Sequence, residues 1–350
     1  MNRIEGLDGL RGYAALLVLA FHTCARAGVA GAQGGYLAVD VFFVMSGYVV
    51  AHAYDARLPE IGFWGFCRLR LIRFYPLYFI GALLGLLLYG VYIVFGHSVD
   101  FTPGQALFGA FLPNLLFLPI VSDHFGDNLF MNPPAWSLMF ELAINFAYAA
   151  AYPWLGRSAL MAIVALGALG VGVCAYVFSG VSAGSGDPAL LIGLARVSYS
   201  FPLGVLLHRQ RQRLPHVGWL GPLTPATLAL ATWSPPSFWR DVVFVLALSP
   251  AIVVIARDAR PALPRLAAFL ATISYCLYII HEPILLLASA ASNRFAIHPP
   301  PLFGGLAIAL VFVAWALDRY YDAPARAWLS RIVPRPAGLP RFSGRARDAA

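Results

Sequence analysis

Runs of about 20 apolar residues recur along this chain, and they restrict its fold more than any other feature. A helix of this length crosses the hydrocarbon core of a bilayer, which is roughly 30 Å thick. A spanning backbone must satisfy its own hydrogen bonds, so such runs form helices. Hydrophobic residues make up 60% of the 350 residues and charged residues only 11%. The sequence therefore predicts an all-α, polytopic helical bundle in a membrane.

The positions of the arginines predict the topology of the bundle. Apolar segments lie at residues 7–27, 36–55, 76–96, 105–121, 136–154, 158–178, 189–208, 217–233, 241–256, 266–290 and 302–318. Segment 105–121 contains two prolines and an asparagine, which suit a re-entrant or surface segment better than a span. Without it, about ten spans remain and most arginines fall on one side. We expect a cytoplasmic (inner) membrane protein with both termini in the cytoplasm.

The basic charge of the chain is explained by membrane topology, and no nucleic-acid partner is expected. The net charge is +8, and the arginines occupy the short segments between spans, with no soluble module to present them. The four cysteines have no disulfide or metal-ligand spacing, so no metal is expected. We expect one membrane domain over residues 1–321 and a cytoplasmic tail, residues 322–350, that is rich in Arg and Pro and disordered.

Ionisable side chains at membrane depth are costly and need a partner, a hydrated cavity or a function. Counting about 1.5 Å per residue places His22, Glu141 and His281 at one level, roughly 8 Å below the outer face. Arg11 and His22 share one helical face about 16 Å apart, which indicates a polar channel. Alternatively, Arg11 extends to the interface beside Asp8, and the two histidines are ordinary core residues.

Two further stretches carry polar residues in or beside spans. "DVFFVMSGYVV" places Asp40 near the outer end of the second span and Ser46 and Gly47 near its middle, where small residues also permit close helix packing. "CRLRLIRFYP" places Arg70 and Arg73 on one face just before the third span. Such a pair suits phosphate binding, although arginines are also common on the cytoplasmic side of spans.

Together and in this order, these stretches resemble the acyltransferase-3 family of membrane-bound acyltransferases over nearly the whole chain. The matching features are "LDGLRG" with the Arg11 to His22 spacing, "VDVFFVMSG", "RLRLIRFYP", "WSLMFE" ending at Glu141, and "SYCLYIIHEP". The resemblance implies ten membrane helices. It also implies transfer of an acyl group, commonly acetyl from acetyl-CoA, to a hydroxyl of a sugar in an envelope or exported glycoconjugate. A single-domain enzyme is expected.

A mechanism follows as a hypothesis. His22 is expected to act as the general base, and Glu141 to orient it as a carboxylate does in a catalytic triad. The phosphates of coenzyme A are expected near Arg11, Arg70 and Arg73. Acyl-CoA is then a co-substrate, with no permanently bound cofactor. The four residues expected to contact substrate or to support the catalytic pair are Asp40, Ser46, Tyr275 and His281.

Other functions remain open. A carbohydrate or glycolipid is the expected acceptor, but its identity does not follow from the residues. The main alternative is a polytopic transporter or exporter of a polar or acylated small molecule, because a channel lined by His, Glu and Arg suits proton-coupled flux. A receptor or scaffold needs no such set of buried polar groups. Arg196 lies mid-span with no obvious acidic partner and receives no role.

Overall fold

The structure is a computed structural model that describes residues 4–94, 102–120, 131–182 and 189–332. These residues form helices and no strand, as the all-α prediction requires. The first half contains α1 (Glu5–Ala27), α2 (Ala38–Tyr54), α3 (Leu58–Val94), α4 (Leu112–Leu115), α5 (Ala135–Ala151) and α6 (Arg157–Val177). The second half contains α7 (Ala189–Arg209), α8 (Leu223–Trp233), α9 (Phe238–Val243), α10 (Ser249–Asp258), α11 (Pro264–Phe295), α12 (Pro299–Leu317) and α13 (Ala323–Ile332).

Seven helical segments of the described chain are long and apolar enough to span a membrane. They are Gly35–Tyr54, Leu58–Tyr92, Arg157–Val177, Ala189–Arg209, Phe238–Asp258, Pro264–Phe295 and Pro299–Ile332. The other three predicted spans correspond to α1, which carries several charged residues, and to α5 and α8, which have 17 and 11 residues. The chain is therefore a polytopic all-α membrane protein, and the count of ten spans stays a prediction.

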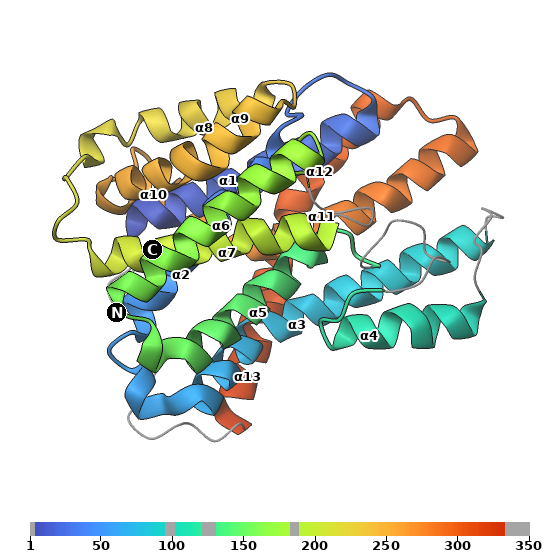
Figure 1. The fold of residues 1–350 in the computed structure, drawn as a ribbon. Helices are drawn as coiled ribbons and strands as arrows, with labels where there is room; N and C mark the ends of the chain where they lie inside the picture. Colours follow the sequence, from blue (N-terminus) through green and yellow to red (C-terminus); the bar gives the residue numbers. More distant parts are fainter. Residues whose placement is uncertain (1–3, 95–101, 121–130, 183–188, 333–350) are drawn as a thin grey trace.

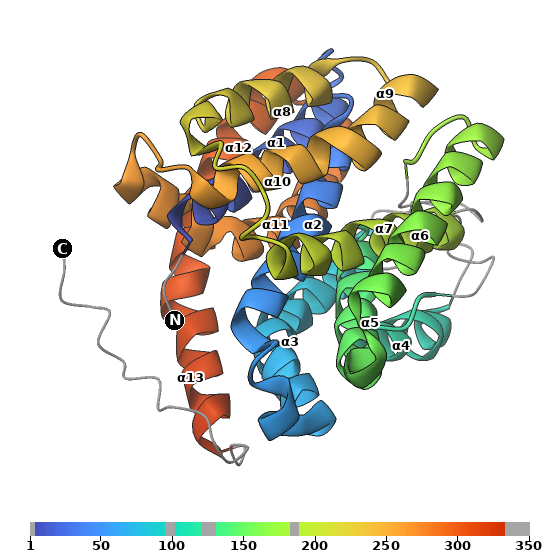
Figure 2. The same cartoon turned by 60° about the vertical axis from the view of Figure 1, so that its left-hand side comes forward.

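The structure describes part of the predicted re-entrant segment and the start of the predicted tail, and both are helical. Within segment 105–121, a π-helix at Gln105–Phe111 continues into the single turn of α4, so the helix is too short to cross a bilayer. The predicted disordered tail instead begins with helix α13, which packs beside the start of α3 in both views (Figures 1 and 2). Residues 333–350 lie outside the described residues.

Small residues allow two helix pairs to pack closely. A Cβ at Gly47 of α2 would collide with the carbonyl oxygen of Phe201 in α7, and one at Gly204 would collide with that of Val44. In the same way, Gly12 of α1 leaves no room for a side chain against Leu270 of α11. Because the backbones approach this closely, α1 lies along α11 and α2 along α7, and each pair holds its facing side chains in register.

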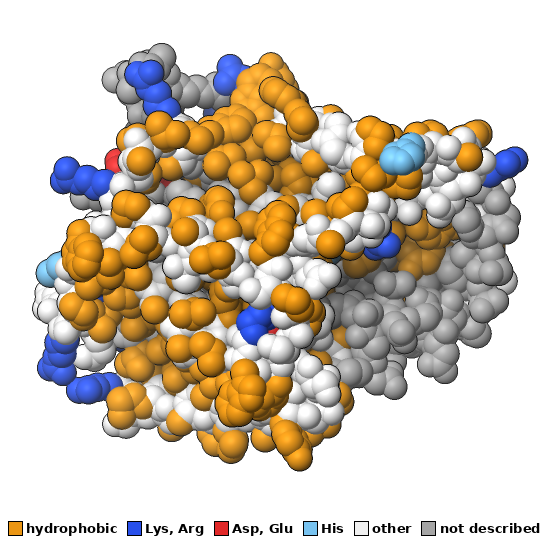
Figure 3. Space-filling view, turned by 90° about the horizontal axis from the view of Figure 1, so that it is seen from above, with side chains coloured by type: hydrophobic (Ala, Val, Ile, Leu, Met, Phe, Trp, Pro, Cys, Tyr) orange, Lys and Arg blue, Asp and Glu red, His pale blue; other side chains and the backbone are white. Residues whose placement is uncertain are grey.

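The surface and the ends of the bundle fit a membrane environment. Seen from above, apolar side chains are spread across the described part of this face, among scattered arginines (Figure 3). At one end, Asp55 after α2 accepts hydrogen bonds from Arg209, with Nε to Oδ2 at 2.7 Å, and from Tyr148. Burial alone would raise the pKa of Asp55, but these two hydrogen bonds outweigh it and hold the pKa below its ordinary value.

Candidate active site

A cavity of about 220 Å³ lies where α1, α2, α3, α5 and α11 meet, and it collects most of the predicted site residues. Its lining includes Arg11, Ser46, Arg70, Arg73, Glu141 and Tyr275, which come from all five helices. Separate sequence stretches thus converge on one space, as the hypothesis of a polar channel requires. The remaining wall is largely aromatic and aliphatic, so the arginines give the cavity a polar end and an apolar body.

Glu141 lies at the polar end of this cavity. Its carboxylate accepts hydrogen bonds from the hydroxyl of Ser46 and from Asn145, at 3.2 Å, and its Oε1 lies 3.5 Å from Nη2 of Arg70. The guanidinium of Arg70 also covers the ring of Phe74, at 4.7 Å from its centre. Glu141 therefore offsets part of the arginine charge and holds Arg70 in place.

Arg73 has partners other than Glu141. Its guanidinium lies 5.3 Å from the ring centre of Tyr275, and its Nη1 lies 3.8 Å from Oδ2 of Asp322. Asp322 is buried and is paired in turn with Arg326 of α13, at 2.7 Å. The segment expected to be a disordered tail thus braces one wall of the cavity.

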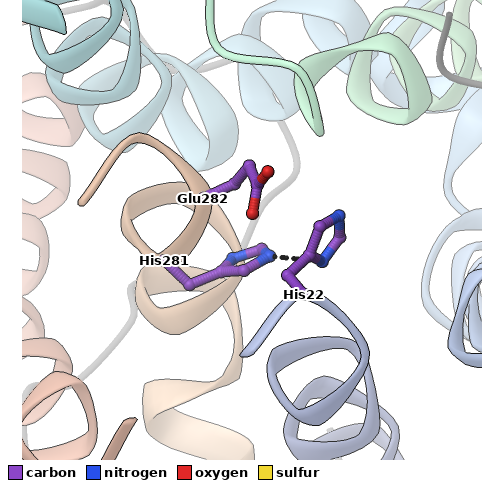
Figure 4. Close-up of side chains that lie close together, drawn as sticks. All are labelled: His22, His281 and Glu282. Atoms are coloured by element: carbon purple, nitrogen blue, oxygen red, sulfur yellow. Dashed lines mark hydrogen bonds between the residues drawn. The ribbon is translucent and has the colours of Figure 1, made fainter. Parts of the chain in front are cut away.

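A second cluster lies farther along α1 and α11 (Figure 4). Nδ1 of His22 is 3.1 Å from Nε2 of His281, and it also lies 3.0 Å from the carbonyl oxygen of Val18. Glu282, beside His281, accepts a hydrogen bond from Nε of Arg26 at 3.2 Å. His281 and Glu282 are buried, whereas His22 is partly exposed.

The expected contact between Glu141 and His22 is not formed, because α5 begins inside the bundle. Asn132, just before α5, donates a hydrogen bond to the carbonyl oxygen of Ile279, and Ser137 lies 2.7 Å from the hydroxyl of Tyr278. Glu141 follows Ser137 by about 6 Å of helix, on the way to Arg70. Counting depth from the outer face placed Glu141 at the level of His22. α5 begins at Ala135, close to the predicted start, but this point lies inside the bundle, so the predicted level is wrong.

Tyr278 borders both the cavity and the histidine pair. It lines the cavity, and its ring centre is 5.9 Å from that of His281. Among the described residues, the lining of the cavity includes neither His22 nor His281. The sequence predicted a single open channel. In this structure the cavity and the histidine pair are distinct, and Tyr278 lies beside both of them.

The comparisons with known proteins identify the family of the chain. The family model described as an acyltransferase domain, that of the acyltransferase-3 family, matches residues 4–319. The chain belongs to the acyltransferase-3 family. It is an integral membrane protein and an O-acyltransferase.

Individual relatives match only part of this chain or of their own length. The chain is 39% identical to protein 2 in the picA locus of Rhizobium radiobacter over 41% of this chain and 79% of that protein. It is 31% identical to acyltransferase MdmB of Streptomyces mycarofaciens, over 42% of this chain and 38% of that protein. A Bacillus subtilis (strain 168) protein provisionally named peptidoglycan O-acetyltransferase YrhL is 40% identical, over 17% of this chain and 10% of its own length. No solved structure matches the chain significantly.

Asp40 of this acyltransferase was expected to contact substrate or to support the catalytic pair, and in the structure it binds a buried arginine. Both of its carboxylate oxygens bind Arg196, at 2.7 and 3.1 Å, and both side chains are fully buried. Arg196 also donates to the carbonyl oxygens of Tyr36 and Val181, each at 2.9 Å. Arg196, which seemed to lack an acid, has one from another helix, and Asp40 does not line the cavity.

Three residues beside the cavity or the histidine pair were not among the predicted site residues. Arg26 follows His22 by four residues and so shares its helical face, a spacing that could have drawn attention to it. Glu282 directly follows His281, but its pairing with Arg26 depends on how α1 lies along α11. Tyr278 precedes His281 by three residues on the same face, and only the packing shows that it borders the cavity.

Proposed function

We propose that this O-acyltransferase moves an acyl group, commonly acetyl, from acyl-CoA to a hydroxyl of a sugar in an envelope or exported glycoconjugate. The observation that best supports the proposal is the cavity with three arginines at one end and, beyond Tyr278 at the other, a histidine pair. A donor with an anionic head, a long flexible arm and a reactive end matches that sequence of environments.

The arginines are suited to the phosphates of coenzyme A. Guanidinium groups make strong, charge-assisted hydrogen bonds to phosphate oxygens. Arg70 and Arg73 are each held against an aromatic ring, so less conformational entropy is lost when a phosphate binds. The pantetheine arm would then lie along the apolar body of the cavity, with Phe42 and Phe43 in its wall and Tyr278 at its far end.

His22 is the proposed base. It takes the proton of the acceptor hydroxyl, and the oxygen attacks the thioester carbonyl to form a tetrahedral intermediate. The intermediate collapses with cleavage of the carbon–sulfur bond, and the proton on His22 passes to the leaving thiolate of coenzyme A. Ester and thiol are the products. Glu141 has a role at the donor end, where it positions Arg70.

The proposed orientation places both termini in the cytoplasm. The arginine end of the cavity then faces the compartment in which coenzyme A is made, and the pair of Arg26 and Glu282 lies toward the opposite side. A carbohydrate or glycolipid acceptor would reach His22 from that side. The name of the Bacillus relative supports an envelope glycan as the acceptor class.

The direct test is release of coenzyme A thiol by the purified protein in detergent, with acetyl-CoA and a panel of glycan acceptors. We expect acceptor-dependent release that His22→Ala reduces by about 10²- to 10⁴-fold, the usual contribution of a positioned base. His216→Ala, which removes an exposed histidine, is the control and should not change the rate. Mass spectrometry of envelope glycans from cells with and without the protein then identifies the acceptor.

The same assay separates the enzyme from a transporter. Detergent abolishes gradients, so acyl transfer in micelles cannot be flux. Substrate movement across proteoliposomes together with no thiol release in detergent would overturn the proposed function and favour the transporter.

A further inference from the structure

His281 is the buried residue whose part in the reaction the proposed function leaves open. Its ring makes two hydrogen bonds through its two nitrogens. Nδ1 lies 3.0 Å from the carbonyl oxygen of Leu277, one helical turn earlier, and Nε2 lies 3.1 Å from Nδ1 of His22 (Figure 4). The contact with Leu277 lies within α11, and the contact with His22 depends on the close packing of α1 on α11.

These contacts determine where the protons lie. A carbonyl oxygen can only accept, so Nδ1 of His281 carries a proton and donates it to Leu277. In the neutral ring Nε2 of His281 is then an acceptor. Nδ1 of His22 faces two acceptors, this nitrogen and the carbonyl oxygen of Val18 at 3.0 Å, and so it must carry a proton too.

The opposite arrangement is unfavourable. If Nε2 of His281 carried the proton instead, lone pairs of both rings would point at the carbonyl oxygens of Leu277 and Val18. Two hydrogen bonds would then be replaced by contacts between lone pairs, which repel each other, while each carbonyl oxygen would keep the backbone N–H of its own helix.

We propose that His281 is a positioning residue that fixes the tautomer of His22 and so leaves Nε2 of His22 free to act as the base. The inference rests on the proposed function, because it states how the base of that reaction is prepared. It assigns His281 no contact with the substrate.

The same contact acts during the reaction. When Nε2 of His22 takes the hydroxyl proton, its Nδ1 proton remains hydrogen-bonded to His281 and Val18. Nε2 of His281, as the acceptor, stabilises the positively charged ring of His22 until the proton passes to the thiolate of coenzyme A. The carboxylate of Glu282 lies within 4.8 Å of the pair and favours the same charge, although Arg26 offsets part of it.

The test compares His281→Gln with His281→Leu. Both remove the titrating ring, but the amide oxygen of glutamine can accept from Nδ1 of His22 and leucine cannot. We expect His281→Leu to lower kcat by about 10- to 100-fold, which is part of the rate that a positioned base supplies. His281→Gln should keep most of the wild-type kcat. KM for acetyl-CoA should stay the same in both, because His281 does not line the donor cavity.

A pH profile adds a readout that mere misfolding would not produce. Without an acceptor the charged form of His22 is less stable, so the acid limb of kcat should lie at lower pH in His281→Leu than in His281→Gln. The charged and titratable neighbours, Arg26, Glu282, Tyr278 and the nearby Tyr92 of α3, are the same in both variants. His208→Leu removes another buried histidine and should leave the limb unchanged.

Nitrogen-15 NMR of histidine-labelled protein tests the tautomer directly. We expect a protonated Nδ1 signal that disappears in His22→Ala. Equal rates and equal acid limbs for His281→Leu and wild type, or an unprotonated Nδ1 on His22, would overturn the inference while leaving the proposed function intact. Full activity of His22→Ala would overturn the proposed function itself.

Discussion

Arg73 shows most clearly how a single side chain would recognise the donor. It is held by Asp322 and Tyr275 and points its charge into the cavity. We expect Arg73→Gln to raise KM for acetyl-CoA about tenfold or more, since a charged hydrogen bond contributes about 1.5–3 kcal/mol, with little change in kcat. Steady-state kinetics with acetyl-CoA measures this.

The control for that prediction uses a donor without the nucleotide. Acetyl-pantetheine has no nucleotide phosphates, so Arg73→Gln and wild type should use it equally well. Arg68→Gln, in the same segment but outside the lining of the cavity, should behave as wild type with both donors. An equal loss with acetyl-pantetheine would show that Arg73 does not bind phosphate.

Residue patterns in the sequence predicted some residues that line the cavity but not the partners of other site residues. Helical periodicity predicted that Arg11 and His22 border one passage, and the structure places only Arg11 of the two in the lining of the cavity. Arg70, Arg73 and Glu141 converge there as well. The partners of His22 and Asp40 could not be predicted, because His281 and Arg196 come from helices far along the chain, and single-sequence periodicity contains no information on which helices pack together.

At the scale of elements, α2 and α7 are joined by backbone contact. Gly47→Ala or Gly204→Ala inserts a methyl group where a carbonyl oxygen already lies, and we expect each to destabilise the protein by about 1–3 kcal/mol. Thermal unfolding in detergent measures the loss. Gly172→Ala in α6 is the matched control, because a Cβ there meets nothing within 4 Å. Unchanged unfolding of all three variants would contradict the packing.

The same two helices are also joined by the buried pair of Asp40 and Arg196. Asp40→Asn leaves the guanidinium of Arg196 without its counter-charge, and breaking a buried pair in this way costs about 3–5 kcal/mol. We therefore expect a large fall in Tm in detergent, with KM for acetyl-CoA unchanged in the folded fraction. An unchanged Tm with a raised KM would return Asp40 to a role in substrate binding.

For the whole molecule, the all-α polytopic class could be predicted because bilayer thickness sets the length of apolar helices. Seven helical segments of the described chain meet that length and apolarity, and the count of ten spans stays a prediction. Depth along a span could not always be predicted, since α5 begins beside Ile279 and Tyr278 and not at the outer surface. Nor could composition show that the Pro- and Arg-rich end begins with α13, whose Arg326 pairs with buried Asp322. Such tertiary contacts override the tendency of that composition toward disorder.

The predicted topology can be tested on a cysteine-free background. Ser234→Cys follows α8 and Arg331→Cys lies near the end of α13, and both positions are exposed. With cytoplasmic termini, we expect a membrane-impermeant maleimide to label Ser234→Cys in intact cells and Arg331→Cys only after permeabilisation. The reverse pattern would place the arginine end of the cavity outside the cytoplasm, where coenzyme A is not made.

The central claim is that the acyl group of a donor held by Arg11, Arg70 and Arg73 reaches the histidine pair by passing Tyr278. Photocrosslinking measures this most directly, using an acyl-CoA analogue with a diazirine in its acyl chain and peptide mass spectrometry of the product. We predict adducts on the segment of α11 that carries Tyr278 and His281 and on the facing part of α1, with competition by acetyl-CoA and loss in Arg70→Gln. Adducts confined to the lipid-facing groove between α6 and α7, or insensitive to acetyl-CoA, would contradict it.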